Sequence, residues 1–167
     1  MKNRKKNLAG YIFVAGFFLF LAWPIFSGIT RLIEGDQKYQ TLNVKLCLIG
    51  FIEKNKRFPT SELELQKKGY LKQETKDNKT IYYVNTENGR YRSKGFQPVP
   101  DFKKIKFAYG IKSRDLARKG KVIYNKRVGY ERLLMIQGPW RSQKRLYRDV
   151  TYELYQELLF QLGLTDG

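Results

Sequence analysis

The sequence predicts an α+β fold: an N-terminal transmembrane helix, then an amphipathic helix packed on an antiparallel β-sheet, and a further helix at the C-terminus. Three observations predict it. Residues 8–29 form a long uncharged apolar run, residues 80–111 contain short runs rich in aromatic and β-branched side chains, and residues 142–163 return to helical spacing. Helical segments at both ends with strands between them are typical of the α+β class.

The apolar run LAGYIFVAGFFLFLAWPIFSGI, from Leu8 to Ile29, predicts a membrane span. At ~1.5 Å per residue such a helix reaches roughly 33 Å, which matches the hydrocarbon thickness of a bilayer. In lipid its backbone can form hydrogen bonds only within the segment, so we expect a helix there, with a kink at Pro24.

Basic residues directly before this run predict its orientation. Lys2, Arg4, Lys5 and Lys6 precede it, and cationic flanks stay on the cytoplasmic side. We therefore expect a single pass through a bacterial inner membrane, with the N-terminus cytoplasmic and the C-terminal domain periplasmic or extracellular. The expected parts are a basic tail, a transmembrane helix and one extracytoplasmic α+β domain, at 1–7, 8–30 and 31–167. The alternative is a cleaved export signal, since a charged start and an apolar run also suit one.

The composition excludes most hydrolytic chemistries. The chain has no histidine and a single cysteine, Cys47, so it lacks the imidazole or the ligand set that Ser-His, Cys-His and zinc mechanisms use. No glycine-rich phosphate loop is present. We expect no cofactor, no metal and no small-molecule substrate, and we expect Cys47 to be a small packing residue.

The charge of the chain is strongly positive. Lys and Arg number 33 against 15 Asp and Glu, which gives a formal net charge of +18. Such an excess indicates an anionic neighbour: lipid headgroups, an acidic envelope polymer, nucleic acid or an acidic face of an assembly. The alternative is that lysine serves only to keep the chain soluble.

A second helix is predicted over 38–54, after a break at Gly35 and Asp36. Its apolar residues recur at three- and four-residue steps and should form a stripe that faces the core. The residues of this stripe are Tyr39, Leu42, Leu46, Leu48, Ile49 and Ile52.

A short helix that begins after Ser61 has clear boundaries. Ser61 can cap its N-terminus, and Glu64, three residues on, can return a hydrogen bond to the Ser61 backbone. Gly69 is placed to end the helix. We expect four residues of this region to pack on the 38–54 helix: Leu63, Leu65, Tyr70 and Leu71.

The sheet is predicted from several short runs. Thr80–Val84 predicts a strand, and Asn88-Gly89 predicts a type I′ hairpin turn with a return strand from Tyr91. Apolar residues alternate with polar or small ones over 105–111, which indicates a half-buried strand. Residues 121–124 and 131–137 are further strand candidates, although 131–137 also suits a helix.

The last segment is predicted to be an amphipathic helix. Leu146, Val150, Leu154 and Leu158 fall four residues apart, and Gly163 is placed as a C-terminal cap.

Two basic clusters are candidate binding sites. Cations interleave with aromatic residues around 102–114, and a second group would share one side of the last helix. The residues are Lys103, Lys104 and Lys106 in the first cluster, and Arg141, Lys144, Arg145 and Arg148 in the second. The first pattern suits single-stranded nucleic acid, because bases stack on rings while cations hold phosphates. The second could bind anionic headgroups or an acidic partner. The alternative for both clusters is a solvated face.

Paired carboxylates would be needed for glycan cleavage. The acids near the predicted sheet are Asp101, Asp115, Glu131 and Asp149. No spacing marks two of them as partners, so we expect a protein that is not an enzyme.

Residues 1–75 resemble type IV pilins and the pseudopilins of type II secretion systems. The likeness is carried by a late proline in the apolar helix, Pro24, and by a stretch after the second helix. The matching positions of that stretch are Phe58, Pro59, Thr60, Leu63, Leu65, Gly69, Tyr70 and Leu71. Pilin precursors have a Gly-Phe boundary and a glutamate early in the apolar helix. Here the apolar run contains no acidic residue and no Gly-Phe boundary stands before it, because Gly16-Phe17 lies inside the span, too deep for a cleavage site. The resemblance therefore implies a pilin-like fold used as a fixed membrane protein.

Two functions follow as expectations. The first is a non-enzymatic, single-pass component or accessory of an envelope assembly, such as a pilus, secretion or DNA-uptake machinery, with membrane lipid and envelope proteins as partners. The second is a membrane-tethered binder of an anionic polymer: nucleic acid, envelope glycan or lipid headgroups.

Overall fold

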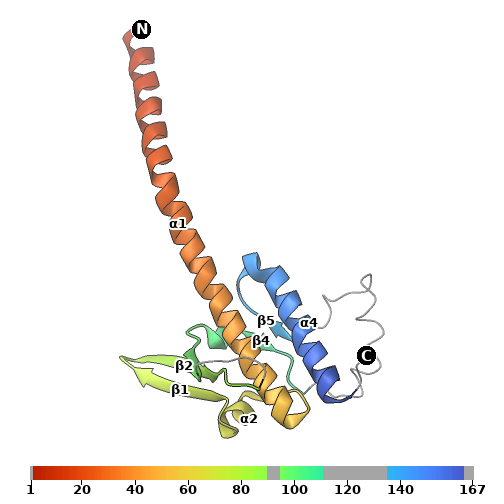
Figure 1. The fold of residues 1–167 in the computed structure, drawn as a ribbon. Helices are drawn as coiled ribbons and strands as arrows, with labels where there is room; N and C mark the ends of the chain where they lie inside the picture. Colours follow the sequence, from red (N-terminus) through yellow and green to blue (C-terminus); the bar gives the residue numbers. More distant parts are fainter. Residues whose placement is uncertain (1, 90–94, 111–134, 164–167) are drawn as a thin grey trace. The chain divides into compact units, whose positions relative to one another are not determined.

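The structure, a computed structural model, describes residues 2–89, 95–110 and 135–163, and within these the side chains of residues 2–16, 19 and 21 are not described. The chain divides into two compact units, Met1–Asp36 and Gln37–Gly167. The second unit combines helices with two small antiparallel sheets (Figure 1). The predicted α+β class is confirmed.

A single helix, α1 (Lys2–Asn55), replaces the two that the sequence predicted. The predicted break at Gly35 and Asp36 is wrong, because a glycine costs only about 1 kcal/mol in a helix and does not by itself end one. Among the described residues no helix is sufficiently long and apolar to cross a membrane. The predicted span 8–30 lies partly outside the residues whose side chains are described.

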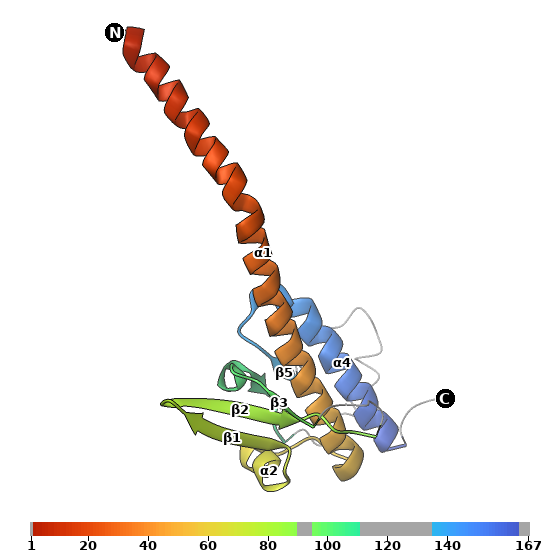
Figure 2. The ribbon, with the colours of Figure 1, turned by 60° about the vertical axis from the view of Figure 1, so that its left-hand side comes forward.

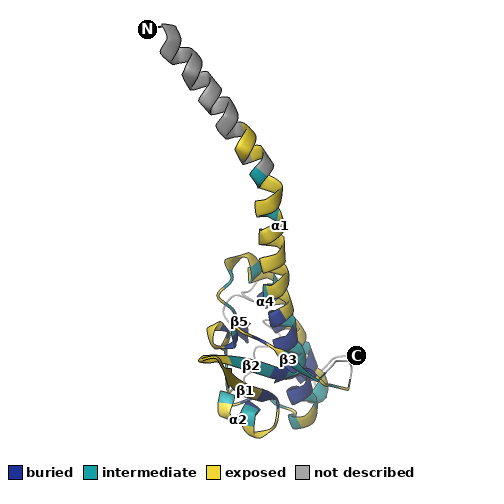
Figure 3. Cartoon of the chain, turned by 90° about the vertical axis from the view of Figure 1, so that its left-hand side faces the viewer, coloured by how far each residue is buried: buried dark blue, intermediate teal, exposed yellow. Residues whose placement is uncertain are grey.

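The C-terminal part of α1 supplies much of the core of the second unit. Ile49 and Ile52 of the predicted stripe are buried, together with Val44 and Phe51, whereas Tyr39 is 55% exposed. The buried segments, dark blue in Figure 3, gather where α1, α4 and the strands meet. Cys47 is buried as expected.

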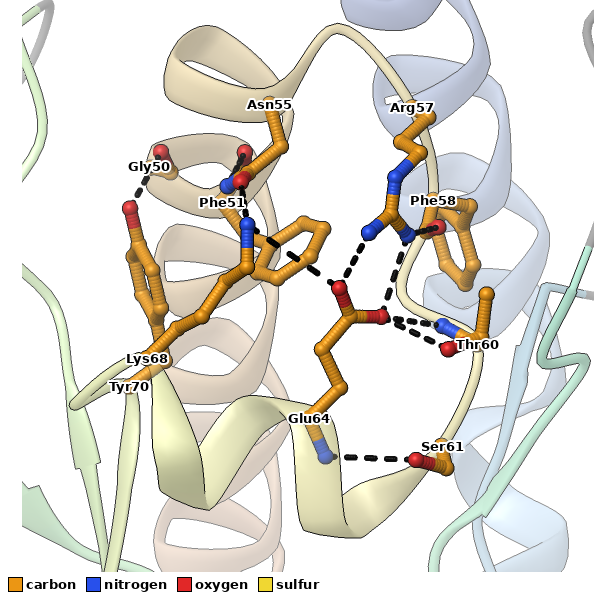
Figure 4. Close-up of polar contacts among 10 residues, drawn as sticks. All are labelled: Gly50, Phe51, Asn55, Arg57, Phe58, Thr60, Ser61, Glu64, Lys68 and Tyr70. Carbon is orange, nitrogen blue, oxygen red and sulfur yellow. Dashed lines mark hydrogen bonds and ion pairs between the residues drawn. The ribbon is translucent and has the colours of Figure 1, made fainter.

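The predicted start of the short helix α2 (Glu62–Lys67) is confirmed in its main feature. The Ser61 side chain accepts a hydrogen bond from the Glu64 backbone at 3.2 Å. The return bond differs from the prediction, because Glu64 Oε2 accepts from the backbone amide of Thr60 at 2.8 Å (Figure 4). Gly69 ends this region with φ +75°, as expected. Leu63 is exposed, so the expectation that it packs on α1 is wrong.

Three strands form the larger sheet, in the order β1-β2-β3, and all are antiparallel. They are β1 (Leu71–Lys76), β2 (Lys79–Asn85) and β3 (Phe96–Pro98). Sequence reasoning missed β1, because all its residues after Leu71 are exposed and no apolar alternation marks it.

The tight turn of this sheet is not where the sequence predicted it. Asp77 and Asn78 have φ of 49° and 59° and join β1 to β2, with Lys76 opposite Lys79. Asn88 and Gly89 do not adopt positive φ, so the predicted type I′ turn there is wrong. Instead, the Thr86 amide donates to the Gly95 carbonyl at 2.9 Å, across a connection that includes residues outside the described set.

The smaller sheet pairs two short strands, β4 (Lys106–Phe107) and β5 (Ile136–Gln137). The 3-10 turn η1 (Phe102–Lys104) precedes β4. The predicted strand 105–111 is thus shorter, although Ile105 is buried and Lys106 exposed, as its alternation required. Strand β5 confirms the end of the 131–137 candidate. Residues 111–134, which include the 121–124 candidate, lie outside the described residues.

The C-terminal helix α4 (Lys144–Gln161) follows the 3-10 turn η3 (Arg141–Gln143). It lies beside the C-terminal part of α1 (Figures 1 and 2), and Lys45 Nζ contacts Glu153 Oε2 at 2.6 Å between them. Val150, Leu154 and Leu158 are buried, as predicted. Gly163 has φ +67°, which suits the expected cap.

Candidate anion-binding cleft

A cleft of about 680 Å³ opens in the second unit, where the β4-β5 pair meets the N-terminal end of α4. Ligand sites in proteins commonly enclose ~300–1,000 Å³. Among the described residues its charged lining is entirely cationic, and consists of Lys104, Lys106, Arg141, Lys144 and Arg148. The uncharged lining is Gln137, Gly138, Pro139, Trp140 and Tyr147.

The β4-β5 pair positions the first side of the cleft. Lys106 is directly opposite Gln137, and Phe107 is opposite Ile136. Because successive side chains of a strand point to opposite faces, the buried Ile136 and half-buried Phe107 turn toward the core, and Lys106 and Gln137 turn outward. The apolar alternation therefore places a lysine on the cleft.

Helical spacing positions the opposite side. Arg141, Lys144 and Arg148 are separated by three and four residues, which brings them to one face of η3 and α4. The first turn of α4 contains no acidic residue, and Gln143 provides no side-chain cap. The backbone N–H groups at this end add partial positive charge to that of the side chains.

The cleft brings together five of the seven residues predicted as binding candidates, and one of the five, Lys104, already has an acidic partner. Lys104 contacts Asp101 Oδ1 at 2.5 Å. Lys106, Arg141 and Lys144 make no ion pair with another residue of the described chain.

Two of the predicted residues lie outside the cleft. Lys103 is paired with Glu62 at 2.7 Å and lies over the Tyr82 ring, and the hydrogen bond to Glu62 raises the pKa of its ammonium group. Lys103 therefore joins η1 to α2. The side chain of Arg145 is 90% exposed and faces Asp149 at 4.0 Å.

Sequence reasoning missed the uncharged part of the lining. Trp140 is half-buried and packs against the core while it lines the cleft. A Cβ built on Gly138 would overlap the hydroxyl of the buried Tyr147, so only glycine fits there. Burial raises the pKa of the Tyr147 phenol, against a smaller opposing influence of the Trp140 backbone and Thr41. The only signal of this lining in the sequence is the run Gly-Pro-Trp-Arg at 138–141, just before the predicted C-terminal helix.

The chain matches no protein-family model, no curated protein and no solved structure.

The lining of the cleft, in the described part of the chain, offers cations, amides and aromatic rings, and no carboxylate or thiol. Of the acids considered for glycan cleavage, Asp101 is paired with Lys104 and Asp149 lies near Arg145. Asp115 and Glu131 lie outside the described residues. Within residues 2–89, 95–110 and 135–163, no three His, Cys, Asp or Glu side chains gather as a metal site would require. What this cleft can do is hold an anion.

Proposed function

We propose that this chain is a non-enzymatic, membrane-tethered binder of an anionic polymer, and that the polymer binds in the cleft between β4-β5 and α4. One observation carries the proposal. Two basic clusters that are separated by more than thirty residues in the sequence line a single cleft, with no acid in its described lining.

Electrostatics favours an anionic occupant. Like charges around one cleft repel one another, and an anion between them converts this repulsion into attraction. The ammonium groups of Lys106 and Lys144 and the guanidinium of Arg141 have no acidic partner among the described residues, so they are available to a ligand. A polymer that engages several cations also gains by releasing its own counterions.

The membrane tether is part of the same proposal. Large apolar side chains on the described part of α1 are exposed, among them Phe20 at 76% and Trp23 at 74%. A helix with such a surface needs an apolar surrounding, and the uncharged run 8–29 with its basic flank suits a bilayer. In that arrangement residues 31–167 lie on the outer side of a bacterial inner membrane.

A second candidate function is a pilin-like component or accessory of an envelope assembly. One observation favours it: α1 continues from the apolar segment into a stretch that packs in the core of an α+β unit, followed at once by the capped helix α2. This order of elements is the one that the resemblance to pilins and pseudopilins implies.

The test is binding of fluorescent polyphosphate by the full chain in detergent micelles, measured by anisotropy over a series of salt concentrations. The cleft variant is R141E/K144E. The matched control is K76E/K79E, which makes the same change of charge at the exposed turn between β1 and β2. We expect the cleft variant to lose at least about tenfold in affinity and the control to lose much less, since binding depends on local cations.

Equal loss in both variants would show that only the net charge matters, and the cleft would not be the binding site. Salt-insensitive co-purification of envelope proteins with both variants, without polymer binding, would support the assembly component instead.

A further inference from the structure

We infer that the polymer held in the cleft is single-stranded nucleic acid, with Trp140 as the ring on which a base stacks and Lys106, Arg141 and Lys144 as the phosphate contacts. This inference rests on the proposed function and names its ligand class. It is carried by the position of a half-buried tryptophan inside a cationic cleft.

The ring of Trp140 favours a ligand with a flat surface over polyanions that offer charge alone. Polyphosphate and the phosphates of lipid headgroups have no surface that stacks on a ring, so cations alone would serve to bind them. An indole that keeps part of its surface on the cleft while it packs on the core offers stacking as well. Every base has a π face, and stacking on an aromatic side chain strengthens binding with little dependence on sequence.

Packing of the indole against the core holds the Trp140 ring in place before any ligand arrives, and the backbone around it is restrained as well. Pro139 precedes it and restricts the backbone on its N-terminal side. The Trp140 carbonyl accepts a hydrogen bond from the Gln143 amide at 3.1 Å, which starts η3. A ring fixed in this way loses little conformational entropy on binding.

The cations that line the cleft with Trp140 come from two separate segments of the chain. Lys106 comes from β4, whereas Arg141 and Lys144 come from η3 and the first turn of α4. The N-terminal end of α4, where Gln143 provides no side-chain cap, adds partial positive charge to the second segment. A base stacked on Trp140 thus lies in the same cleft as cations that can contact its phosphates.

The experiment uses the two tryptophans of the chain, Trp23 and Trp140. In the W23F variant of the full chain in micelles, Trp140 is the only tryptophan and reports on the cleft by its fluorescence. Three unlabelled ligands are titrated: a thymidine oligonucleotide, an abasic oligonucleotide with the same number of phosphates, and polyphosphate. A single-stranded RNA oligonucleotide and a DNA duplex are titrated as two further ligands.

We expect the thymidine oligonucleotide to quench Trp140 and to bind about tenfold more tightly than its abasic counterpart, with a similar salt dependence for both. W140L should remove the preference for bases and keep the salt dependence, and W140F should keep part of the preference. The duplex should show no preference over polyphosphate, because its bases are stacked inward.

Equal affinity for the thymidine and abasic strands, with no quenching, would overturn the inference while the proposed function stands. If none of the ligands shows salt-dependent binding, the proposed function is overturned as well. The comparison of ligands on W23F alone decides the inference even if substitution of Trp140 disturbs the fold.

Discussion

Arg57 and Glu64 meet in a two-pronged ion pair beside α2, in which Arg57 Nη1 donates to Glu64 Oε2 at 3.0 Å and Nη2 donates to Oε1 (Figure 4). The same carboxylate accepts the amide and the hydroxyl of Thr60, each at 2.8 Å. The hydrogen bond from Arg57 is the main cause that lowers the pKa of Glu64 to about 2, from an ordinary 4.5. Only 14% of the Glu64 side chain is exposed, so the pair is shielded from solvent on that side.

Glu64→Gln should lower the free energy of unfolding by about 2 kcal/mol at pH 7, because charge-assisted hydrogen bonds are lost. A carboxylate with a depressed pKa stabilises the fold above pH 4.5, and this contribution disappears as the pH falls toward 2. Urea unfolding of the full chain in micelles, followed by near-ultraviolet circular dichroism, measures it. The control is Glu74→Gln on the exposed strand β1. A difference between variant and wild type that persists at pH 2 would contradict this assignment.

Gly50 allows the chain after β2 to approach α1. A Cβ built at this position lies 2.6 Å from the Glu87 carbonyl oxygen, which is backbone and cannot easily move away. Gly50→Ala should therefore destabilise the second unit by roughly 1–3 kcal/mol, despite the better helix propensity of alanine. The matched control in the same helix is Gly35→Ala, where a Cβ meets nothing within 4 Å. Denaturant midpoints measure both, and a loss for Gly35→Ala as large as that for Gly50→Ala would refute the steric explanation.

Cys47 should be unreactive in the folded protein. It is buried and its thiol donates to the Tyr70 carbonyl at 3.4 Å, and burial raises the pKa of the thiol to about 12. Alkylation requires the thiolate, so iodoacetamide at pH 8 should label Cys47 only as the chain unfolds. Mass spectrometry across a urea series measures the labelled fraction, which should follow the unfolding curve. Rapid labelling without urea would place Cys47 at the surface.

The basic residues named from the sequence should separate into two groups. Lys106→Ala and Arg141→Ala should each weaken polymer binding and reduce the slope of log affinity against log salt by about 0.7, the value for one phosphate contact with a single strand. Lys103→Ala and Arg145→Ala should leave the slope unchanged, because Lys103 is paired with Glu62 and Arg145 does not line the cleft. Anisotropy titrations measure the four slopes. Four equal slopes would mean that the cleft has no special part in binding.

The sequence predicted well where nearby backbone groups or helical periodicity decide the structure, although the local turn signal at Asn88-Gly89 was wrong. The Ser61 cap and the Gly69 and Gly163 ends depend on nearby backbone groups, and the buried stripes of α1 and α4 depend on helical periodicity. It failed where the deciding contact is distant or where no apolar pattern exists. Strand β1 is exposed after Leu71 and shows no apolar alternation, so nothing marked it as a strand. Helix α1 continues through Gly35 because the cost of one glycine in a helix is small, whereas the rule that glycine marks a turn predicted a break there.

Composition and local patterns are enough to predict the α+β class and to establish the excess of positive charge, the absence of histidine and the two groups of basic residues. Which of these cations share a cleft depends on the packing of distant segments. The pairing of Lys106 with Gln137 and the start of α4 at Lys144 bring segments together that no spacing along the chain could relate. The same contacts assign Lys103 to Glu62 and place Trp140 among the cations, because the position of a side chain in space depends on the packing of whole elements.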